Sequence, residues 1–500
     1  MQIRKLAVFL ALISTFAAAQ SKSKLTIDEF FNSVSFSGVE ISPDGNSVAI
    51  ETERADWDQQ TFRTDLWLYR SGSLIQLTQS GHDSEPKWSP DGKWIAFVSE
   101  REGAAGKNND ANSKDDESTS EIYVISPNGG EAIQLTHGGE DVHTFSWSAD
   151  SQTIYFATRQ PWTKTQKDDY KDKWKDVVQY RTAERGDTIF ALDVASALSS
   201  HEARSTKVEK KEGEPEENPD TTREARAIAS IPLRVEHLIT APDGTKLAFT
   251  SNAINQRQEK YSDVEIYVVD LKNVERALLP ANAGSEKIAE VQPRRITHNE
   301  AEETRPRWDS DSRHIFFSVE VGDVSGPYRD LQPHLYRIDI EKPDIEGGKT
   351  EQWAKDFIGP VEHYVVAGDH ILASARQGTE VQLYSASKPA DPLHKLSNWP
   401  GTYSQISAAD HSPKIAFIYS STTKPEEIYL SDSADKLDEA RPITSFNATL
   451  AEKDLPQGKP YQWKSDDGTT VEGMLIFPPG KFEQKHLPMF TLIHGGPADA

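Results

Sequence analysis

Cysteine is absent from all 500 residues of the sequence. Its absence excludes disulfide bonds, thiolate metal sites, a cysteine nucleophile and a lipid anchor attached through an N-terminal cysteine. A packed core and hydrogen bonds must therefore hold the fold together. Material for a core is plentiful, because 36% of the residues are hydrophobic and 11 Trp, 15 Tyr and 19 Phe can be buried.

Long hydrophobic runs are also missing. After the basic residues Arg4 and Lys5, an apolar run at residues 6–16 precedes three alanines that end at Ala19, which is the order typical of a secretory signal peptide. The run is shorter than the roughly 18 apolar residues of a membrane-spanning helix. We therefore expect a signal peptide over residues 1–19, export to the periplasm or the medium, and no membrane attachment after cleavage. An uncleaved anchor is the alternative.

Positive charge is scarce relative to negative charge. The sequence has 55 Lys and Arg residues against 79 Asp and Glu residues, for a net charge of −24. Nucleic-acid binding requires patches of Lys and Arg that neutralise phosphates, so we expect no nucleic-acid partner. The plainest consequence of the negative charge is solubility.

Motifs for metals and nucleotide cofactors are missing as well. The sequence has no His-Glu-x-x-His, no Walker loop and no Gly-x-Gly-x-x-Gly. His137 and His143, with Glu140 and Asp141 between them, offer a set of metal-ligating side chains. They fall in a predicted loop, however, where polar residues need no metal. We expect no metal site and no cofactor.

The sequence does contain an internal repeat. Ser-Pro-Asp-Gly occurs at residues 42–45 and 89–92, each time between two apolar segments, and related turns occur at residues 148–151, 241–244 and 309–312. Proline presets φ for a turn, and aspartate and glycine tolerate the left-handed conformation. Each of these segments therefore predicts a β-hairpin.

Two more predicted strands follow each hairpin. Glu-Ile-Tyr-Val at residues 121–124 and 265–268 alternates around an aromatic residue, as a half-buried strand does. Endings such as Ile-Gln-Leu-Thr at residues 75–78 and 133–136 complete four-stranded units. Seven units fit between residues 39 and 444, which predicts a seven-bladed β-propeller. A linear β-solenoid and a pair of β-sandwiches are the alternatives, but a solenoid repeat is shorter and sandwiches do not keep one motif in one order.

Three segments interrupt the repeat. Residues 103–120 and 199–226 are rich in charged and small polar residues, so we expect surface loops there. Residues 159–186 carry aromatic residues among lysines and aspartates, and the spacing of Tyr170 and Trp174 places both on one face of a helix. This aromatic edge either overhangs a substrate cavity or packs the inserted helix onto its own blade, which is the plainer account.

The pattern changes after residue 444. A hairpin is predicted around Asp-Asp-Gly at residues 466–468, and an apolar run at residues 487–493 suits a strand inside a sheet covered by helices. Directly after it come four residues in the order His494, Gly495, Gly496 and Pro497. Acyl-transfer enzymes of the α/β-hydrolase fold place such a turn where backbone N–H groups approach a developing oxyanion. Alone, Gly-Gly-Pro is often only a turn, but the hairpin and strand before it favour the functional interpretation.

With these segments in this order, the sequence resembles the prolyl oligopeptidase family, especially its acylaminoacyl-peptidase-like and dipeptidyl-peptidase-like members. The resemblance extends from residues 25–30 through the repeats to the HGGP turn. It implies a seven-bladed propeller that caps a hydrolase domain, with peptide cleavage by a Ser, Asp and His triad at their interface. It also implies that the backbone N–H of Gly496 is an oxyanion donor, next to Gly495, whereas His494 and Pro497 shape the turn.

The expected organisation is a signal peptide at residues 1–19, an N-terminal segment at 20–38, the all-β seven-bladed propeller at 39–446 and the truncated start of an α/β-hydrolase domain at 447–500. In that fold the triad follows the HGG turn in the order Ser, acid, His. No Gly-x-Ser-x-Gly occurs in the sequence. We therefore expect Ser, Asp and His beyond Ala500, no catalytic residue within the chain, and no activity from this fragment.

For the intact protein, the sequence predicts an exported serine peptidase that cleaves small peptides through an acyl-enzyme. An esterase of the same fold is one alternative, because esters and amides need the same oxyanion stabilisation. A non-enzymatic periplasmic propeller that binds protein partners is the other. The choice among dipeptidyl, acylaminoacyl and prolyl substrates stays open, as does the oligomeric state.

Overall fold

The computed structural model describes residues 22–101, 119–169, 185–205, 225–253, 263–272, 291–299, 301–321, 332–344 and 349–492. The predicted signal peptide and the HGGP turn at residues 494–497 lie outside these described residues, as do Tyr170 and Trp174 of the predicted inserted helix. Within the described ranges, no helix is long and apolar enough to cross a membrane.

Seven four-stranded units follow one another along the described chain, and we call them blades 1 to 7. Blades 1 and 2 contain β1 (Ser35–Ile41), β2 (Ser47–Asp56), β3 (Thr61–Arg70), β4 (Ser73–Gln76), β5 (Asp83–Trp88), β6 (Ile95–Ser99), β7 (Glu121–Ile125) and β8 (Ile133–Gln134). Blades 3 and 4 contain β9 (Val142–Trp147), β10 (Thr153–Arg159), β11 (Asp187–Asp193), β12 (Arg226–Ile231), β13 (Val235–Thr240), β14 (Lys246–Ala253), β15 (Asp263–Asp270) and β16 (Arg294–Arg295).

The remaining three blades have the same order of strands. Blades 5 and 6 contain β17 (Glu302–Trp308), β18 (His314–Val321), β19 (His334–Asp339), β20 (Glu351–Trp353), β21 (Val361–Ala367), β22 (His370–Gln377), β23 (Glu380–Ala386) and β24 (His394–Lys395). Blade 7 contains β25 (Thr402–Ala408), β26 (Ile415–Ser421), β27 (Lys424–Ser431) and β28 (Arg441–Pro442).

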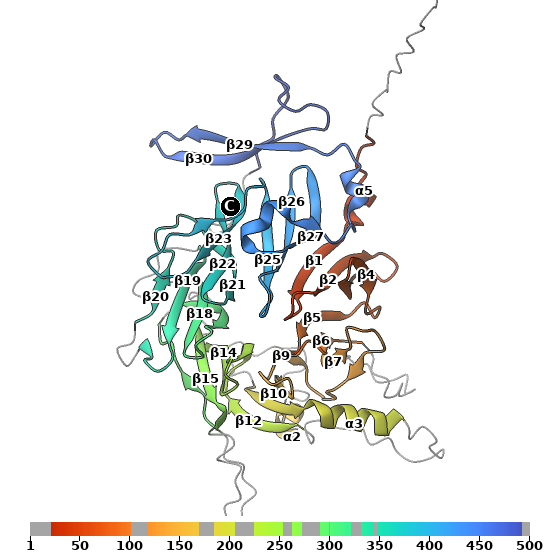
Figure 1. The fold of residues 1–500 in the computed structure, drawn as a ribbon, viewed down its shortest axis with the longest axis vertical. Coiled ribbons are helices and arrows are strands. Elements are labelled where there is room, and N and C mark those ends of the chain that lie inside the picture. The colour runs from red at the N-terminus through yellow and green to blue at the C-terminus, as the bar shows by residue number, and fades with distance from the viewer. Residues whose placement is uncertain are drawn as a thin grey trace, which may run out of the picture.

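The blades lie side by side around a common centre, so that blade 7 returns to blade 1 (Figure 1). The first strands of neighbouring blades contact one another, as β1 does with β5 and β25, which places the first strand of each blade innermost. Single parallel bridges, Val264 with Glu302 and Val381 with Thr402, join blade 4 to blade 5 and blade 6 to blade 7. This radial arrangement confirms the predicted propeller over a solenoid or a pair of sandwiches.

The Ser-Pro-Asp-Gly segments form the turn between the first and second strands. In blade 1 the Ser42 hydroxyl donates a hydrogen bond of 2.6 Å to the Asp44 carboxylate, and Gly45 has a φ of 72°. In blade 2 the Ser89 hydroxyl donates to Asp91 at 2.7 Å. The polar side chains fix the turn and the glycine takes the left-handed conformation. The repeat in the sequence is therefore the repeat of one hydrogen-bonded turn.

A second motif, which we call the acid–threonine latch, explains the recurrent acid and threonine of the repeats. In blade 7, Thr444 Oγ1 accepts from the N–H of Ile428 at 2.9 Å and donates to Glu427 at 2.5 Å, and this carboxylate also accepts from the N–H of Asn447 at 2.7 Å. The hydroxyl-to-backbone bond recurs at 2.8 to 2.9 Å in four other blades, through Thr78, Thr136, Thr297 and Ser397. The latch satisfies backbone groups where the short fourth strand ends.

The ring closes between blades 1 and 7 without exchange of a strand, because each blade takes all four strands from its own part of the chain. Apolar side chains of the two blades form one buried cluster. Ser407 Oγ accepts from the N–H of Ile41 at 3.0 Å, and the Asn447 side chain bonds the N–H and C=O of Val34 at 2.9 and 2.8 Å. Packing and side-chain hydrogen bonds, rather than a shared sheet, hold this junction.

The described helices are short. They are α1 (Ile27–Phe31), α2 (Lys164–Asp169), α3 (Val194–Ser205), the 3₁₀ helix η4 (Ala434–Glu439) and α5 (Ala448–Ala451). The prediction of a loop over residues 199–226 is wrong for residues 199–205, which continue α3. Val194 and Ala197 anchor this helix in the core between blades 2 and 3, so burial at its start outweighs the polar composition of its end.

Beyond the ring, β29 (Gln457–Lys464) and β30 (Thr470–Phe477) form a separate antiparallel hairpin, which confirms the hairpin predicted there (Figure 1). The chain reaches it through a segment tied to the N-terminal residues. The N–H of Asp454 donates to the C=O of Ser23 at 2.9 Å, and Lys453 pairs with Glu29 at 2.5 Å. The exit from the ring is therefore fixed beside its entry.

The strand predicted for residues 487–493 is absent from residues 487–492, which have no regular secondary structure. Met489, Phe490 and Leu492 are 75%, 93% and 97% exposed. An interior strand needs neighbouring strands for its backbone and covering layers for its side chains. The described residues supply neither at this place, and they include no α/β-hydrolase sheet.

Candidate functional site

The residues predicted to stabilise an oxyanion, Gly495 and Gly496 with His494 and Pro497 beside them, lie outside the described residues, which end at Leu492. The structure therefore describes the residues that precede this turn in the sequence, but not the turn itself. Two described features are relevant: the hairpin β29–β30, and a group of charged side chains at the centre of the ring.

Glu472 attaches the hairpin to blade 6. Its Oε1 accepts from the N–H of Thr379, in the turn between β22 and β23, at 2.8 Å, and its Oε2 accepts from Gln462 Nε2 at 2.6 Å. The hydrogen bond from Gln462 lowers the pKa of Glu472. Gly378 in the same turn has a φ of 61°, and a Cβ there would collide with the Glu472 carboxylate. Glycine at this position therefore permits the close approach of the hairpin.

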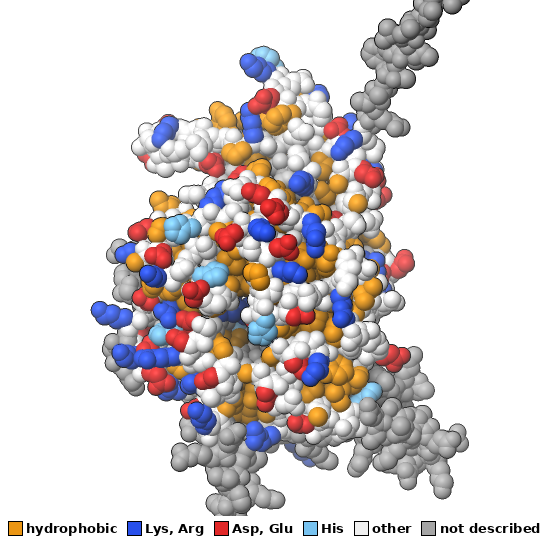
Figure 2. Space-filling view, viewed as in Figure 1, with side chains coloured by type: hydrophobic (Ala, Val, Ile, Leu, Met, Phe, Trp, Pro, Cys, Tyr) orange, Lys and Arg blue, Asp and Glu red, His pale blue; other side chains and the backbone are white. Residues whose placement is uncertain are grey.

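The hairpin exposes apolar side chains on both of its faces. Tyr461 and Trp463 are 54% and 45% exposed on one face, and Met474 and Ile476 are 39% and 62% exposed on the other. Apolar side chains are visible at the surface of this projection (Figure 2). A two-stranded hairpin is at best marginally stable alone, and exposed apolar faces of this kind are typical of packing surfaces.

The innermost strands carry a bulge that recurs around the ring. Glu85, His237, Arg305 and Gln405 have φ values of 53°, 50°, 50° and 48°, each at an irregularity in the pairing of the first and second strands of its blade. Non-glycine residues in the left-handed region store local strain, and bulges redirect side chains near functional sites. The backbone at the centre of the ring is thus shaped by the same device in four blades.

Titratable side chains from five blades lie around this centre. Arg307 of blade 5 acts electrostatically on Glu40 of blade 1, Lys87 of blade 2, His237 of blade 4 and His363 of blade 6. Charges act on one another appreciably only within about 10 Å at ordinary ionic strength. These five residues therefore form one group, which we call the axial cluster.

Enclosure by the blades changes the ionisation of the axial cluster. Burial raises the pKa of Glu40 and lowers the pKa of Lys87. Burial, and then the charges of Arg307 and Arg305, lower the pKa of His363 to about 3, so this imidazole is neutral at pH 7. Glu40 keeps accessible surface, and the desolvation that raises its pKa is consistent with a side chain that faces a space enclosed by the blades.

Contacts with neighbouring blades hold two members of the axial cluster. Lys87 Nζ donates to the C=O of Phe145 at 2.8 Å and lies 4.2 Å from the centroid of its ring. Ser407 Oγ donates to Glu40 at 3.2 Å. Among the described residues, the buried Nδ1 of His363 has no hydrogen-bond partner. The cluster therefore offers charges of both signs and an unused ring nitrogen, which are groups that bind peptide backbones and termini.

His143, one of the two histidines considered as metal ligands, is hydrogen-bonded to a buried carboxylate. Its Nε2 lies 2.6 Å from Oδ2 of Asp187, a buried carboxylate whose Oδ1 lies 3.3 Å from Arg159. Buried acids need such partners. Asp187 also accepts from the N–H of Val235 in blade 4 at 2.6 Å, so His143 has a structural role in blade 3 where it meets blade 4.

Asp309, Asp311 and His314 also lie close enough together to share a cation. Arg337 occupies the same place, however, since its guanidinium donates to Asp309 at 2.7 Å and lies 3.7 Å from Asp311. A guanidinium cannot be deprotonated and opposes a second cation. This group is an ion-pair network on the surface of blade 5.

The fold and the site define the protein as a β-propeller with an appended hairpin. Proteins of known sequence or structure are similar to this chain. No family model matches the sequence. The uncharacterized peptidase YuxL of Bacillus subtilis is 22% identical over 498 residues, and the match covers 95% of this chain and 67% of YuxL. An acylaminoacyl peptidase of Pyrococcus horikoshii matches with a TM-score of 0.58 and 15% identity, over 92% of this chain and 60% of that structure.

A third match isolates the ring. The β-propeller domain of the trilobed protease of Pyrococcus furiosus, described as having an open velcro topology, matches with a TM-score of 0.50 and 13% identity over 83% of this chain and 99% of that domain. The chain is thus similar in sequence to a peptidase and similar in fold to an acylaminoacyl peptidase and to the propeller domain of a protease. It spans about 60% of the length of the P. horikoshii acylaminoacyl peptidase structure.

Sequence reasoning missed the axial cluster. Its members are far apart in the sequence, and polar residues within strand segments are ordinarily solvent-facing. A local signal did exist, because Lys87 and Arg307 both stand directly before the tryptophan that precedes a turn. That position is on the innermost strand of each blade, and reading it across the seven repeats would have collected Glu40 as well.

Proposed function

We propose that the whole protein is an exported serine-type peptidase that hydrolyses small peptides through an acyl-enzyme. The observation that carries this proposal is that similarity to a peptidase extends over 95% of the chain while the HGGP residues follow the hairpin in the order that the α/β-hydrolase fold requires. Residues 447–500 would form the start of that hydrolase domain, and the triad of Ser, Asp and His would follow beyond residue 500.

In this mechanism the backbone N–H of Gly496, next to Gly495, donates to the oxygen on which negative charge develops. The serine attacks the carbonyl carbon, the histidine takes its proton and returns it to the leaving amine, and water then releases the acyl group. The axial cluster supplies polar groups on the propeller side that suit a peptide. The exposed faces of the hairpin fit against the domain that carries the triad.

The experiment is a rate comparison on the full-length protein. A Gly496→Val variant displaces the N–H donor, so the rate on aminoacyl, dipeptidyl and acylaminoacyl nitroanilides should fall by about two to three decades. Gly139→Val is the matched control, because no atom lies within 4 Å of a Cβ at Gly139. Undiminished turnover by the Gly496→Val variant would contradict the proposed oxyanion donor.

Two other outcomes of the same experiment point elsewhere. Rapid hydrolysis of short acyl esters without hydrolysis of any anilide would identify an esterase. Failure of the full-length protein to react with a fluorophosphonate, which labels activated serines, would instead indicate a non-enzymatic propeller that binds protein partners.

A further inference from the structure

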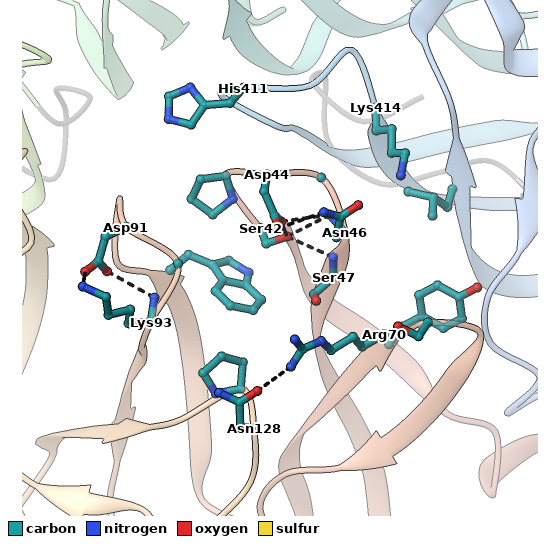
Figure 3. A pocket seen from close by; sticks show the side chains of 18 of the residues that line it. Ser42, Asp44, Asn46, Ser47, Arg70, Asp91, Lys93, Asn128, His411 and Lys414 are labelled. Carbon is teal, nitrogen blue, oxygen red and sulfur yellow. Dashed lines mark hydrogen bonds and ion pairs between the residues drawn. The ribbon is translucent and has the colours of Figure 1, made fainter.

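A cavity of about 1310 Å³ opens among blades 1, 2 and 7, and we call it the turn-face cavity (Figure 3). Turns between the first and second strands of the three blades contribute to its walls, including residues 42–47 and 90–94. Because the strands of a blade are antiparallel, these turns lie on the opposite face of the ring from the β22–β23 turn that holds the hairpin. The cavity is therefore separate from the hairpin.

The two carboxylates of the turn-face cavity are engaged in their own turns. Asp44 accepts from the Ser42 hydroxyl at 2.6 Å and from the side chain of Asn46 at 2.9 Å, and the bond from Ser42 lowers the pKa of this acid. Asp91 accepts from Ser89 at 2.7 Å and pairs with Lys93 at 2.8 Å. These acids are therefore not available to bind a cationic ligand.

The basic side chains of the cavity are in surplus. The lining includes four basic side chains and only two carboxylates, although the whole chain carries a net charge of −24. The basic residues are Arg70, Lys93, Lys414 and Arg441. Arg70 donates one hydrogen bond, to Asn128 at 2.7 Å. Among the described residues, no hydrogen bond or ion pair occupies the side chains of Lys414 and Arg441. Their ammonium and guanidinium groups are free to bind an anion.

Aromatic rings complete the lining. Tyr69, Trp88 and Trp94 contribute to the walls, and Trp88 is fixed by a hydrogen bond of 2.9 Å from its Nε1 to the C=O of Glu40. The volume exceeds the roughly 300–1,000 Å³ of common small-molecule sites. The cavity can therefore hold several linked groups, with apolar parts against the rings and anionic parts against the cations.

We propose that the turn-face cavity binds a short acidic peptide segment in which carboxylate side chains flank an apolar residue. The carboxylates contact Lys414, Arg441 and Arg70, and the apolar side chain lies against the aromatic walls. A nucleic acid also carries anionic groups and flat rings, but the net charge of −24 repels an extended polyanion. A peptide of a few residues places only local charge in the basic cavity and avoids this repulsion.

The test uses the full chain and a fluorescein-labelled, terminally blocked peptide of sequence Glu-Glu-Tyr-Glu-Glu, with Gln-Gln-Tyr-Gln-Gln as its neutral counterpart. Fluorescence anisotropy measures binding to the wild type and to a Lys414→Gln, Arg441→Gln double variant. We expect the double variant to bind the acidic peptide at least about tenfold more weakly, because two charge-assisted contacts are lost. Higher salt should weaken binding to the wild type as well.

The control is an Arg54→Gln, Lys355→Gln double variant, which removes the same charge at exposed positions outside the cavity. It should bind within about twofold of the wild type, and unchanged thermal melting of both variants would show that folding is intact. Equal loss of binding in the control, or equal binding of the neutral peptide, would overturn the proposal. The proposal would also be overturned if inorganic phosphate or heparin displaced the labelled peptide at the concentration at which unlabelled peptide displaces it.

Discussion

The ring and the segment that follows it both contain apolar residues predicted to form strands, but they differ in what covers those side chains. In blade 7, Phe417 is fully buried and stacks on Tyr429 with ring centroids 6.0 Å apart. After the hairpin, Phe490 is 93% exposed. The difference teaches that an apolar segment becomes a buried strand only where neighbouring strands and a covering layer are present. In the ring each blade provides this layer for the next.

Truncation of an aromatic side chain should separate the two regions most strongly. Phe417→Ala removes a fully buried ring and leaves a cavity, so we expect the free energy of unfolding to fall by about 3–5 kcal/mol. Phe490→Ala removes an exposed ring and should change it by less than about 0.5 kcal/mol. Urea denaturation followed by tryptophan fluorescence measures both variants. A large loss from Phe490→Ala would show that residues 487–492 are covered in solution.

Buried acids give the ring a pH dependence that the hairpin lacks. Burial raises the pKa of Glu121 from 4.5 to about 7. Because the folded state holds this proton more tightly, the stabilisation from Glu121 is complete below pH 4.5 and is lost as the pH rises through 7. Between about pH 5 and pH 8, the free energy of unfolding should therefore fall by about 2–3 kcal/mol less in Glu121→Gln than in the wild type.

Thermal melting across that pH range measures the effect of Glu121→Gln. Glu472→Gln in the hairpin is the control, since the pKa of Glu472 is lowered rather than raised. Its slope of stability against pH should match the wild type closely. A Glu121→Gln variant with the wild-type slope would mean that other buried acids, such as Glu427 with its raised pKa, dominate the titration.

The acid–threonine latch should matter more than an equivalent hydroxyl in the hairpin. Thr444→Val leaves the N–H of Ile428 without its partner and removes one of two hydrogen bonds to Oε2 of Glu427, at a cost of about 1–2 kcal/mol in the free energy of unfolding. Thr470, whose hydroxyl accepts only from the exposed Lys464, should tolerate valine within about 0.5 kcal/mol. Equal effects in urea denaturation would show that the latch follows from the sheet rather than supports it.

The sequence predicted what is local. Turns such as residues 42–45 and strands such as residues 121–124 are specified by adjacent residues, so their repetition predicts seven blades and their order. The sequence shows the latch only as recurring acidic and threonine residues, because its hydrogen bonds join Thr444 to Glu427 and Ile428 on the preceding strand. Its hydrogen bonds could be identified only once the fold placed these strands side by side.

Sites built from residues of several blades could not be predicted from the sequence. The axial cluster collects Glu40, Lys87 and Arg307 from three blades, and the turn-face cavity combines turns of three blades. Ring geometry, not sequence spacing, creates both sites. Composition also misjudged residues 199–205, where burial of the first turn of α3 extended a helix into a polar segment.

The smallest predicted effect concerns the joint between the two regions. The carboxylate of Glu472 accepts from the N–H of Thr379 at 2.8 Å, and this single, partly buried contact outside the core of the ring adds little to global stability. Glu472→Ala should therefore leave the unfolding midpoint unchanged but accelerate hydrogen exchange at the Thr379 amide by about five- to tenfold, because a local opening loses one charge-assisted bond. Glu483→Ala, which breaks the Lys459 pair at the far end of the hairpin segment, should not alter that amide. If both variants accelerate it equally, the hairpin docks through its whole length rather than through Glu472.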